Sequence, residues 1–126
     1  FGYNAGMAFQ IRDDILDLIG SEKELGKPPG SDIRQGNITL PVIYALQEPA
    51  LRPRLLEQIA EIRAAEGNAD IAEFLTLIRN SAGIVRSEEL VDRYIAKAIR
   101  SLEALPDNKA RRNLKEIALF IGHRKF

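Results

Sequence analysis

Three aspartates stand close together in residues 9–17, which read Phe-Gln-Ile-Arg-Asp-Asp-Ile-Leu-Asp. On a helix Asp13 and Asp17 project from one face a turn apart, and Asp14 lies about 100° around the axis. Carboxylates crowded in this way repel one another, so we expect a counter-ion beside them. Oxygen ligands of this kind suit Mg²⁺, which binds one or two carboxylates together with waters and substrate phosphates. The spacing therefore predicts a magnesium site at Asp13, Asp14 and Asp17.

The alternative is an acidic stripe that simply faces water, which is the usual fate of a charge run on an amphipathic helix. The next segment of the chain favours the magnesium site over a solvated stripe. Residues 20–36 are rich in Gly and Pro, carry several charges, and form a longer connection than most loops. Lys27 in this loop is a candidate partner for a diphosphate, because a flexible ammonium can follow a leaving group.

The rest of the chain predicts an all-α protein of about six helices with no sheet. Apolar residues recur at spacings of three and four, and nothing alternates with period two for long. Gly, Pro and candidate cap residues divide the chain. We expect helices over about residues 2–19, 37–48, 50–65, 70–79 and 84–105, and a last helix capped by Asp107 that buries Leu114, Ile117, Ala118 and Ile121 before it ends at Gly122.

Composition limits the partners and the compartment. The chain has 126 residues, enough for one domain (1–126), and its 18 basic and 18 acidic residues cancel, so nothing draws it as a whole toward nucleic acid. It has no cysteine, which fits a reducing compartment, and we expect a cytoplasmic protein with no transmembrane segment. It begins with Phe1 and its only methionine is Met7, so we expect a piece of a longer protein.

Taken in order, the acids and the loop resemble the second aspartate-rich motif and following loop of the trans-type polyprenyl diphosphate synthases. The likeness is closest to long-chain bacterial members such as the catalytic subunit of heptaprenyl diphosphate synthase. The short basic end, residues 124–126, also looks like that family's C-terminus. The residues that carry the resemblance are Phe9, Gln10, Asp13, Asp14, Asp17, Gly26, Lys27, Asp32, Ile33, Gly36, Thr39, Leu40 and Pro41.

The resemblance implies an enzyme with the helical isoprenoid synthase fold that uses Mg²⁺. Asp13 and Asp17 would hold the metal on an allylic diphosphate, and Asp14 would support them. The allylic diphosphate would ionise to a carbocation, isopentenyl diphosphate would attack it, and a proton would leave. Fixed cations suit this chemistry because negative charge builds on the departing diphosphate.

The same resemblance assigns residues outside the acid motif. Gln10 would line the allylic pocket, Lys27 would contact the diphosphate, and Asp32 would order metal-bound water. Asn37 stands where many relatives carry a basic residue, so one cation around the diphosphate is expected to be absent.

The family's first aspartate-rich motif and its isopentenyl diphosphate arginines are missing from this sequence. We therefore expect roughly the C-terminal half of a synthase, inactive alone, belonging to a homo- or hetero-oligomer. Apolar surface around Met7, Ile11, Ile15 and residues 40–46 is expected to drive self-association. The competing hypothesis is a non-catalytic, synthase-like helical interaction subunit.

Overall fold

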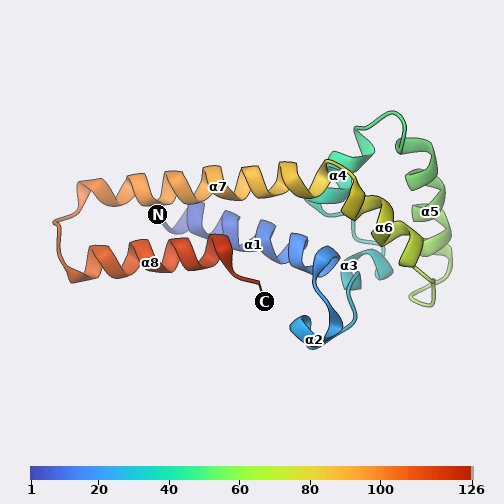
Figure 1. The fold of residues 1–126 in the computed structure, drawn as a ribbon, viewed down its shortest axis with the longest axis horizontal. Coiled ribbons are helices and arrows are strands. Elements are labelled where there is room, and N and C mark those ends of the chain that lie inside the picture. Colours follow the sequence, from blue (N-terminus) through green and yellow to red (C-terminus); the bar gives the residue numbers. More distant parts are fainter. Residues whose placement is uncertain (126) are drawn as a thin grey trace.

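The computed structural model describes residues 1–125, and over that range it is all-helical with no strand (Figure 1). This confirms the predicted fold class. The elements are α1 (Gly2–Ile19), α2 (Glu22–Leu25), α3 (Ser31–Arg34), α4 (Leu40–Leu46), α5 (Arg52–Ala64), α6 (Ala72–Asn80), α7 (Gly83–Ser101), a 3₁₀ turn η1 (Leu102–Ala104) and α8 (Lys109–His123).

Helix α1 is the centre of the arrangement. It lies along the long helix α7 and also contacts α8, while α4, α5 and α6 gather at the other end of the molecule (Figure 1). Ile11, Ile15 and Leu18 lie on one face of α1 and are buried in the core. This burial fixes the rotation of α1 about its axis, so the aspartates on its other side are held toward solvent and the loop.

A close contact between α4 and α7 fixes the N-terminal end of α7. Gly83 is the first residue of α7, and a Cβ there would clash with the carbonyl oxygen of Pro41. Pro41 lies in the first turn of α4, where the N–H that proline lacks would have no partner within the helix. We infer that a larger residue at position 83 would force the two helices apart.

Most predicted elements are present, and the differences are local. The six longer helices correspond to the six expected ones, while the loop contains two one-turn helices, α2 and α3, that its Gly and Pro content had hidden. Helix α8 is capped by Asn108, whose side chain accepts the N–H of Arg111 at 3.0 Å, so the prediction of Asp107 as the cap was wrong. Ile117 is 50% exposed although it was expected to be buried.

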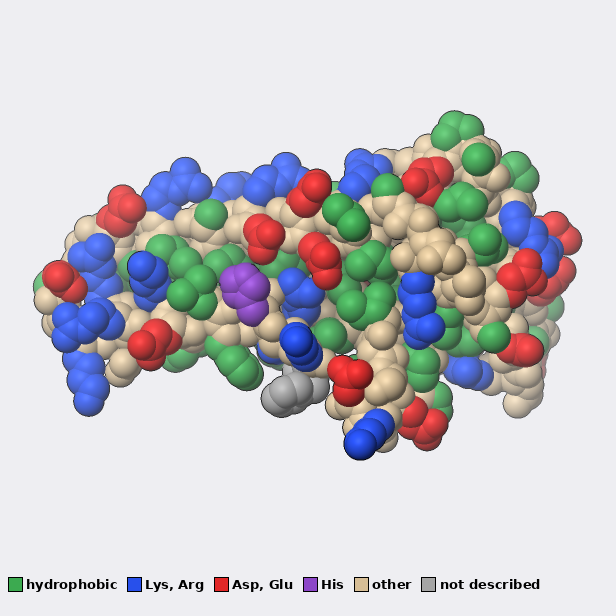
Figure 2. Space-filling model, viewed as in Figure 1, with side chains coloured by type: hydrophobic (Ala, Val, Ile, Leu, Met, Phe, Trp, Pro, Cys, Tyr) green, Lys and Arg blue, Asp and Glu red, His purple; other side chains and the backbone are tan. Residues whose placement is uncertain are grey.

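Part of the apolar surface that was expected to drive self-association is buried, whereas Ile43, within residues 40–46, is 44% exposed. Ile11 and Ile15 are buried and share the core with Val42 and Ala45 of α4. Figure 2 shows charged side chains of both signs among the hydrophobic ones on one face of the molecule. In the described part of the chain, the exposed large hydrophobic residues are Tyr3, Phe9, Ile19, Ile43, Leu56, Val85, Leu105, Ile117, Leu119 and Phe120.

No helix within residues 1–125 combines the length and the apolar character that a membrane span requires.

Candidate functional site

One cavity of about 500 Å³ gathers every site residue that the sequence predicts. It lies between α1 and the loop that carries α2 and α3. Helical spacing brings three of its acids together, and the loop returns to α1 because the Gly30 N–H donates to the backbone oxygen of Asp17 at 2.7 Å. We call it the acidic cavity, and its lining residues are Gln10, Asp13, Asp14, Leu16, Asp17, Glu24, Leu25, Lys27, Asp32 and Arg124.

Asp17 holds the loop against α1. It is only 6% exposed, and its two carboxylate oxygens accept the backbone N–H groups of Ser31 and Asp32, each at 3.1 Å. The Lys27 Nζ lies 3.9 Å from Oδ1 of the same carboxylate. The sequence suggested Asp17 as a metal ligand, whereas in this structure its oxygens already bind the start of α3 and the loop lysine. Asp17 thereby sets where Lys27 and Asp32 border the acidic cavity.

Asp13 is paired with a residue from the far end of the chain. The Arg124 Nη2 forms an ion pair with Oδ1 of Asp13 and also donates to the backbone oxygen of Phe9 at 3.2 Å. The guanidinium carbon of Arg124 lies 4.3 Å from the centroid of the Phe9 ring, a cation–π distance. Arg124 therefore belongs to the site. Its only signal in the sequence was a weak one, the basic end of a chain with no net charge.

Asp14 is the acid whose charge is least compensated. The pKa of Asp14 is raised to about 6, chiefly by burial and also by the nearby carboxylates of Asp32, Asp13 and Asp17. A hydrogen bond from Nε2 of Gln10 to Oδ1 of Asp14, at 3.3 Å, opposes this effect by lowering the pKa. Burial and neighbouring negative charge therefore both disfavour the ionised form of Asp14.

The ionised form of Asp32, on the loop side of the cavity, is disfavoured in the same way. Burial is the first cause that raises its pKa, and the charge of Asp17 adds to it, while Lys27 acts in the opposite direction. Since both Asp14 and Asp32 border the same cavity, one added cation between the helix and the loop would stabilise both ionised carboxylates.

The donor set fits a hydrated magnesium ion. Carboxylate oxygens are hard ligands, and Mg²⁺ completes its octahedral shell with waters and phosphate oxygens instead of demanding an all-protein cage. Within residues 1–125 no three His, Cys, Asp or Glu side chains are already gathered closely enough to hold a metal ion. An ion held in this cavity would therefore have few direct protein ligands and would keep most of its waters.

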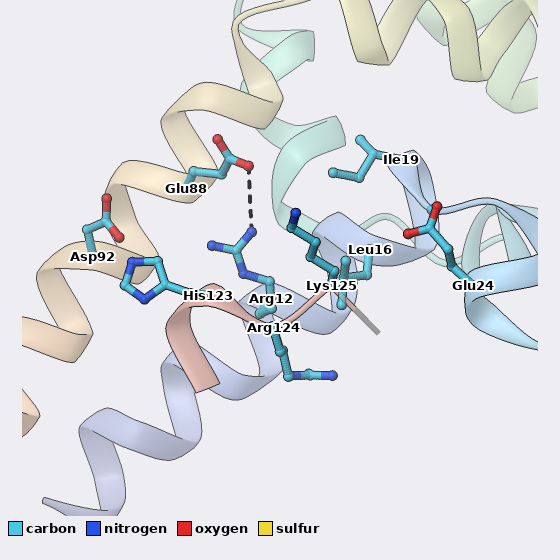
Figure 3. A pocket seen from close by; sticks show the side chains of 10 residues that line it. Arg12, Leu16, Ile19, Glu24, Glu88, Asp92, His123, Arg124 and Lys125 are labelled. Carbon is cyan, nitrogen blue, oxygen red and sulfur yellow. Dashed lines mark ion pairs between the residues drawn. The ribbon is translucent and has the colours of Figure 1, made fainter. Parts of the chain in front are cut away.

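A second cavity, of about 440 Å³, borders α1 on the side of α7 and α8, and we call it the paired cavity (Figure 3). Sequence reasoning did not find it. Arg12 is 9% exposed, donates through Nη2 to the Gly122 carbonyl oxygen at 2.6 Å, and lies 3.5 Å from Oε1 of Glu88 through Nη1. Its lining residues are Arg12, Leu16, Ile19, Gly20, Glu24, Glu88, Asp92, His123, Arg124 and Lys125.

Known proteins resemble this chain over its whole length. The polyprenyl synthetase family model matches residues 1–78. The chain is 46% identical to heptaprenyl diphosphate synthase component 2 of Geobacillus stearothermophilus over 126 residues, covering 100% of this chain and 38% of that protein. The corresponding protein of Bacillus subtilis is 43% identical, with 100% and 35% covered. The chain thus spans less than two fifths of the length of these relatives.

Solved structures agree with the sequence comparison. The polyprenyl synthase of Caulobacter crescentus, complexed with calcium and isoprenyl diphosphate, matches with a TM-score of 0.84 and 33% identity, covering 99% of this chain and 38% of that one. The heptaprenyl diphosphate synthase of Staphylococcus aureus matches with a TM-score of 0.82 and 31% identity, with the same coverage. From its sequence and its fold, this chain belongs to the polyprenyl synthetase family.

Proposed function

We propose that this chain supplies the diphosphate end of the active site of a magnesium-dependent prenyltransferase. The reaction would join an allylic diphosphate to isopentenyl diphosphate and lengthen a polyprenyl diphosphate. The observation that carries the proposal is the acidic cavity, in which the acids of α1 face the loop lysine. The names of the relatives, heptaprenyl diphosphate synthase among them, support the same reaction class.

The proposed metal ligands are Asp13 and Asp14. A bound Mg²⁺ would supply positive charge where negative charge develops on the departing diphosphate. Asp17 serves this site indirectly, because its carboxylate holds the N–H groups of Ser31 and Asp32 and so fixes the loop. This division of roles differs from the one implied by the sequence, in which Asp17 was a direct ligand.

Lys27 and Gln10 are proposed to contact the allylic substrate. The Lys27 side chain is 56% exposed and borders the acidic cavity, so its ammonium can move from Asp17 to a phosphate oxygen. Gln10 donates to Asp14 and thereby favours the ionised form of that carboxyl group. Asp32, held by Asp17, would orient water around the metal.

We further propose that the chain does not complete the reaction alone. The longer relatives contain residues that this chain does not match, and some relatives are named component 2, which supports a role in an assembly of more than one subunit. A cytoplasmic location remains a prediction. Turnover of both substrates by the purified 126-residue chain with Mg²⁺ would contradict this part of the proposal.

The proposed metal site can be tested by isothermal titration of inorganic pyrophosphate in the presence of Mg²⁺. We expect Asp13→Ala to weaken binding about 100-fold, since it removes a direct ligand of the metal. The matched control is Asp92→Ala, which removes an exposed acid from the paired cavity and should leave binding unchanged. Equal binding by wild type and Asp13→Ala would contradict the assignment and favour a non-catalytic interaction subunit.

A further inference from the structure

Arg124 reaches the acidic cavity because the end of α8 is fixed against α1. Arg12 of α1 donates to the carbonyl oxygen of Gly122 at 2.6 Å, two residues before Arg124. The Arg124 side chain is 9% exposed and lies against the ring and backbone oxygen of Phe9. Its guanidinium is thus placed by the fold beside Asp13, and not by chance contact of a loose terminus.

The charges of the acidic cavity show what Arg124 does there. Five carboxylates and two cations line it among the described residues, and each cation lies beside one acid, Lys27 by Asp17 and Arg124 by Asp13. Within this described set Asp14, Glu24 and Asp32 have no such cation partner, and the pKa values of Asp14 and Asp32 are raised. Removal of Arg124 from Asp13 without a substitute cation would therefore leave four acids of this cavity without a cation partner, Asp13 among them.

We propose that Arg124 is a second diphosphate-binding cation of this site, and that it is the counter-ion of Asp13 until a divalent metal takes that carboxylate. The inference rests on the proposed function. A metal ion and the Arg124 Nη2 compete for Oδ1 of Asp13, so metal binding releases donors of the guanidinium. A guanidinium is a planar fork of N–H donors that matches phosphate oxygens, and the contacts with Phe9 keep it at the cavity.

This exchange predicts that one substitution has opposite effects on two ligands. Without the competing guanidinium, Arg124→Gln should bind Mn²⁺ alone about threefold more tightly, as expected for loss of a partly screened cation. The same variant should bind inorganic pyrophosphate with Mg²⁺ about tenfold more weakly, because a charge-assisted hydrogen bond to the ligand is lost. A general loss of structure would weaken both.

The experiment compares the 126-residue wild type, Arg124→Gln, Arg124→Lys and Lys125→Gln. Electron paramagnetic resonance of free Mn²⁺ measures the metal alone, and calorimetry measures pyrophosphate with Mg²⁺. Lys125→Gln is the matched control, since it removes the same charge from the next, exposed residue and should change either affinity less than about twofold. Arg124→Lys keeps the charge without the fork, so its pyrophosphate affinity should lie between those of wild type and Arg124→Gln.

The outcomes separate this inference from the function on which it rests. Arg124→Gln affinities equal to wild type, or shifted in the same direction for both ligands, would overturn the inference while the proposed function stands. Wild type that fails to bind pyrophosphate with Mg²⁺, or Asp13→Ala that binds as wild type does, would overturn the proposed function and the inference with it. If Arg124→Gln does not fold, equal affinities of Arg124→Lys and wild type would overturn the inference.

Discussion

The two cavities beside α1 differ in charge much more than in size. Their volumes are about 500 and 440 Å³, and they share Leu16, Glu24 and Arg124. Among the described residues, the acidic cavity has five acids against two cations. The paired cavity has three acids, Glu24, Glu88 and Asp92, against three cations, Arg12, Arg124 and Lys125. An excess of negative charge, rather than volume, therefore distinguishes the cavity in which we propose the metal site.

The partners of the charged groups show the same difference. In the paired cavity Arg12 is matched by a carbonyl oxygen and a carboxylate, an arrangement that holds α1, α7 and α8 together. In the acidic cavity Asp14 accepts a hydrogen bond from Gln10 and has a raised pKa. We conclude that the Arg12 contacts in the paired cavity stabilise the fold, whereas Asp14 in the acidic cavity stays without a cation partner at some cost in stability.

The largest expected effect on stability lies in the paired cavity. Arg12→Met should lower the free energy of unfolding by about 2 kcal/mol, because it leaves the Gly122 carbonyl oxygen without its donor and Glu88 without its cation. The loss should stay below that of a fully buried pair, since the Glu88 side chain is 41% exposed. Urea unfolding measures it, and Arg93→Met, at an exposed position of α7, is the control. Equal stability of Arg12→Met and wild type would remove the distinction between the two cavities.

In the acidic cavity we expect a substitution to raise the free energy of unfolding, by a smaller amount. The pKa of Asp14 is about 6 in the fold against an ordinary 3.8, so the stability that protonated Asp14 confers is present below about pH 4 and lost as the pH rises through 6. At pH 8 and without metal, Asp14→Asn should therefore stabilise the chain. We expect about 1 kcal/mol, because the side chain is only partly buried and water screens the repulsion.

Urea unfolding at pH 8 and at pH 4 measures this pH dependence, with a chelator present. The advantage of Asp14→Asn should vanish at pH 4, where wild-type Asp14 is protonated. Asp92→Asn, in the paired cavity, should show no such dependence on pH. An Asp14→Asn variant that is less stable than wild type at pH 8 would show that the acidic cavity is not under charge repulsion.

The smallest expected effect concerns the loop lysine. Lys27→Met should weaken pyrophosphate binding with Mg²⁺ about threefold, since an exposed ammonium is well screened by water. Lys23→Met is the control, because Lys23 lies in α2 but does not line the acidic cavity. Calorimetry measures both. A loss of more than about tenfold for Lys27→Met would mean that the loop closes over the ligand and excludes water from the ion pair.

The sequence alone predicted the parts that depend on local spacing. The bounds of α1 agree with the predicted residues 2–19, because apolar spacing and a stop at Gly20 are local signals. The six predicted site residues line one cavity because four of them lie within two turns of α1, and Lys27 and Asp32 come from the adjoining loop. The bounds of α1 and the clustering of its acids follow from local spacing, whereas the role of Asp32 was assigned only through the family resemblance.

The parts that the sequence did not predict are contacts between distant or competing groups. Arg124 and Asp13 are 111 positions apart, and helical periodicity carries no information about which cation meets which acid. The prediction that Ile117 is buried was wrong for a related reason. Periodicity identifies the apolar face of α8 but not whether another helix covers that face. At the start of α8, Asp107 and Asn108 were both competent caps, and one residue of register decided between them.

The hold of Asp17 on the loop also makes the loop observable by isotope exchange. Ser31 and Asp32 lie in a surface loop, but their backbone N–H groups donate to the carboxylate of Asp17, which is buried. Their replacement by deuterium should be slow while the loop is docked, as should that of the Gly30 N–H, which donates to the backbone oxygen of Asp17. These amide signals thus report directly on whether the loop is docked on α1, before any ligand is added.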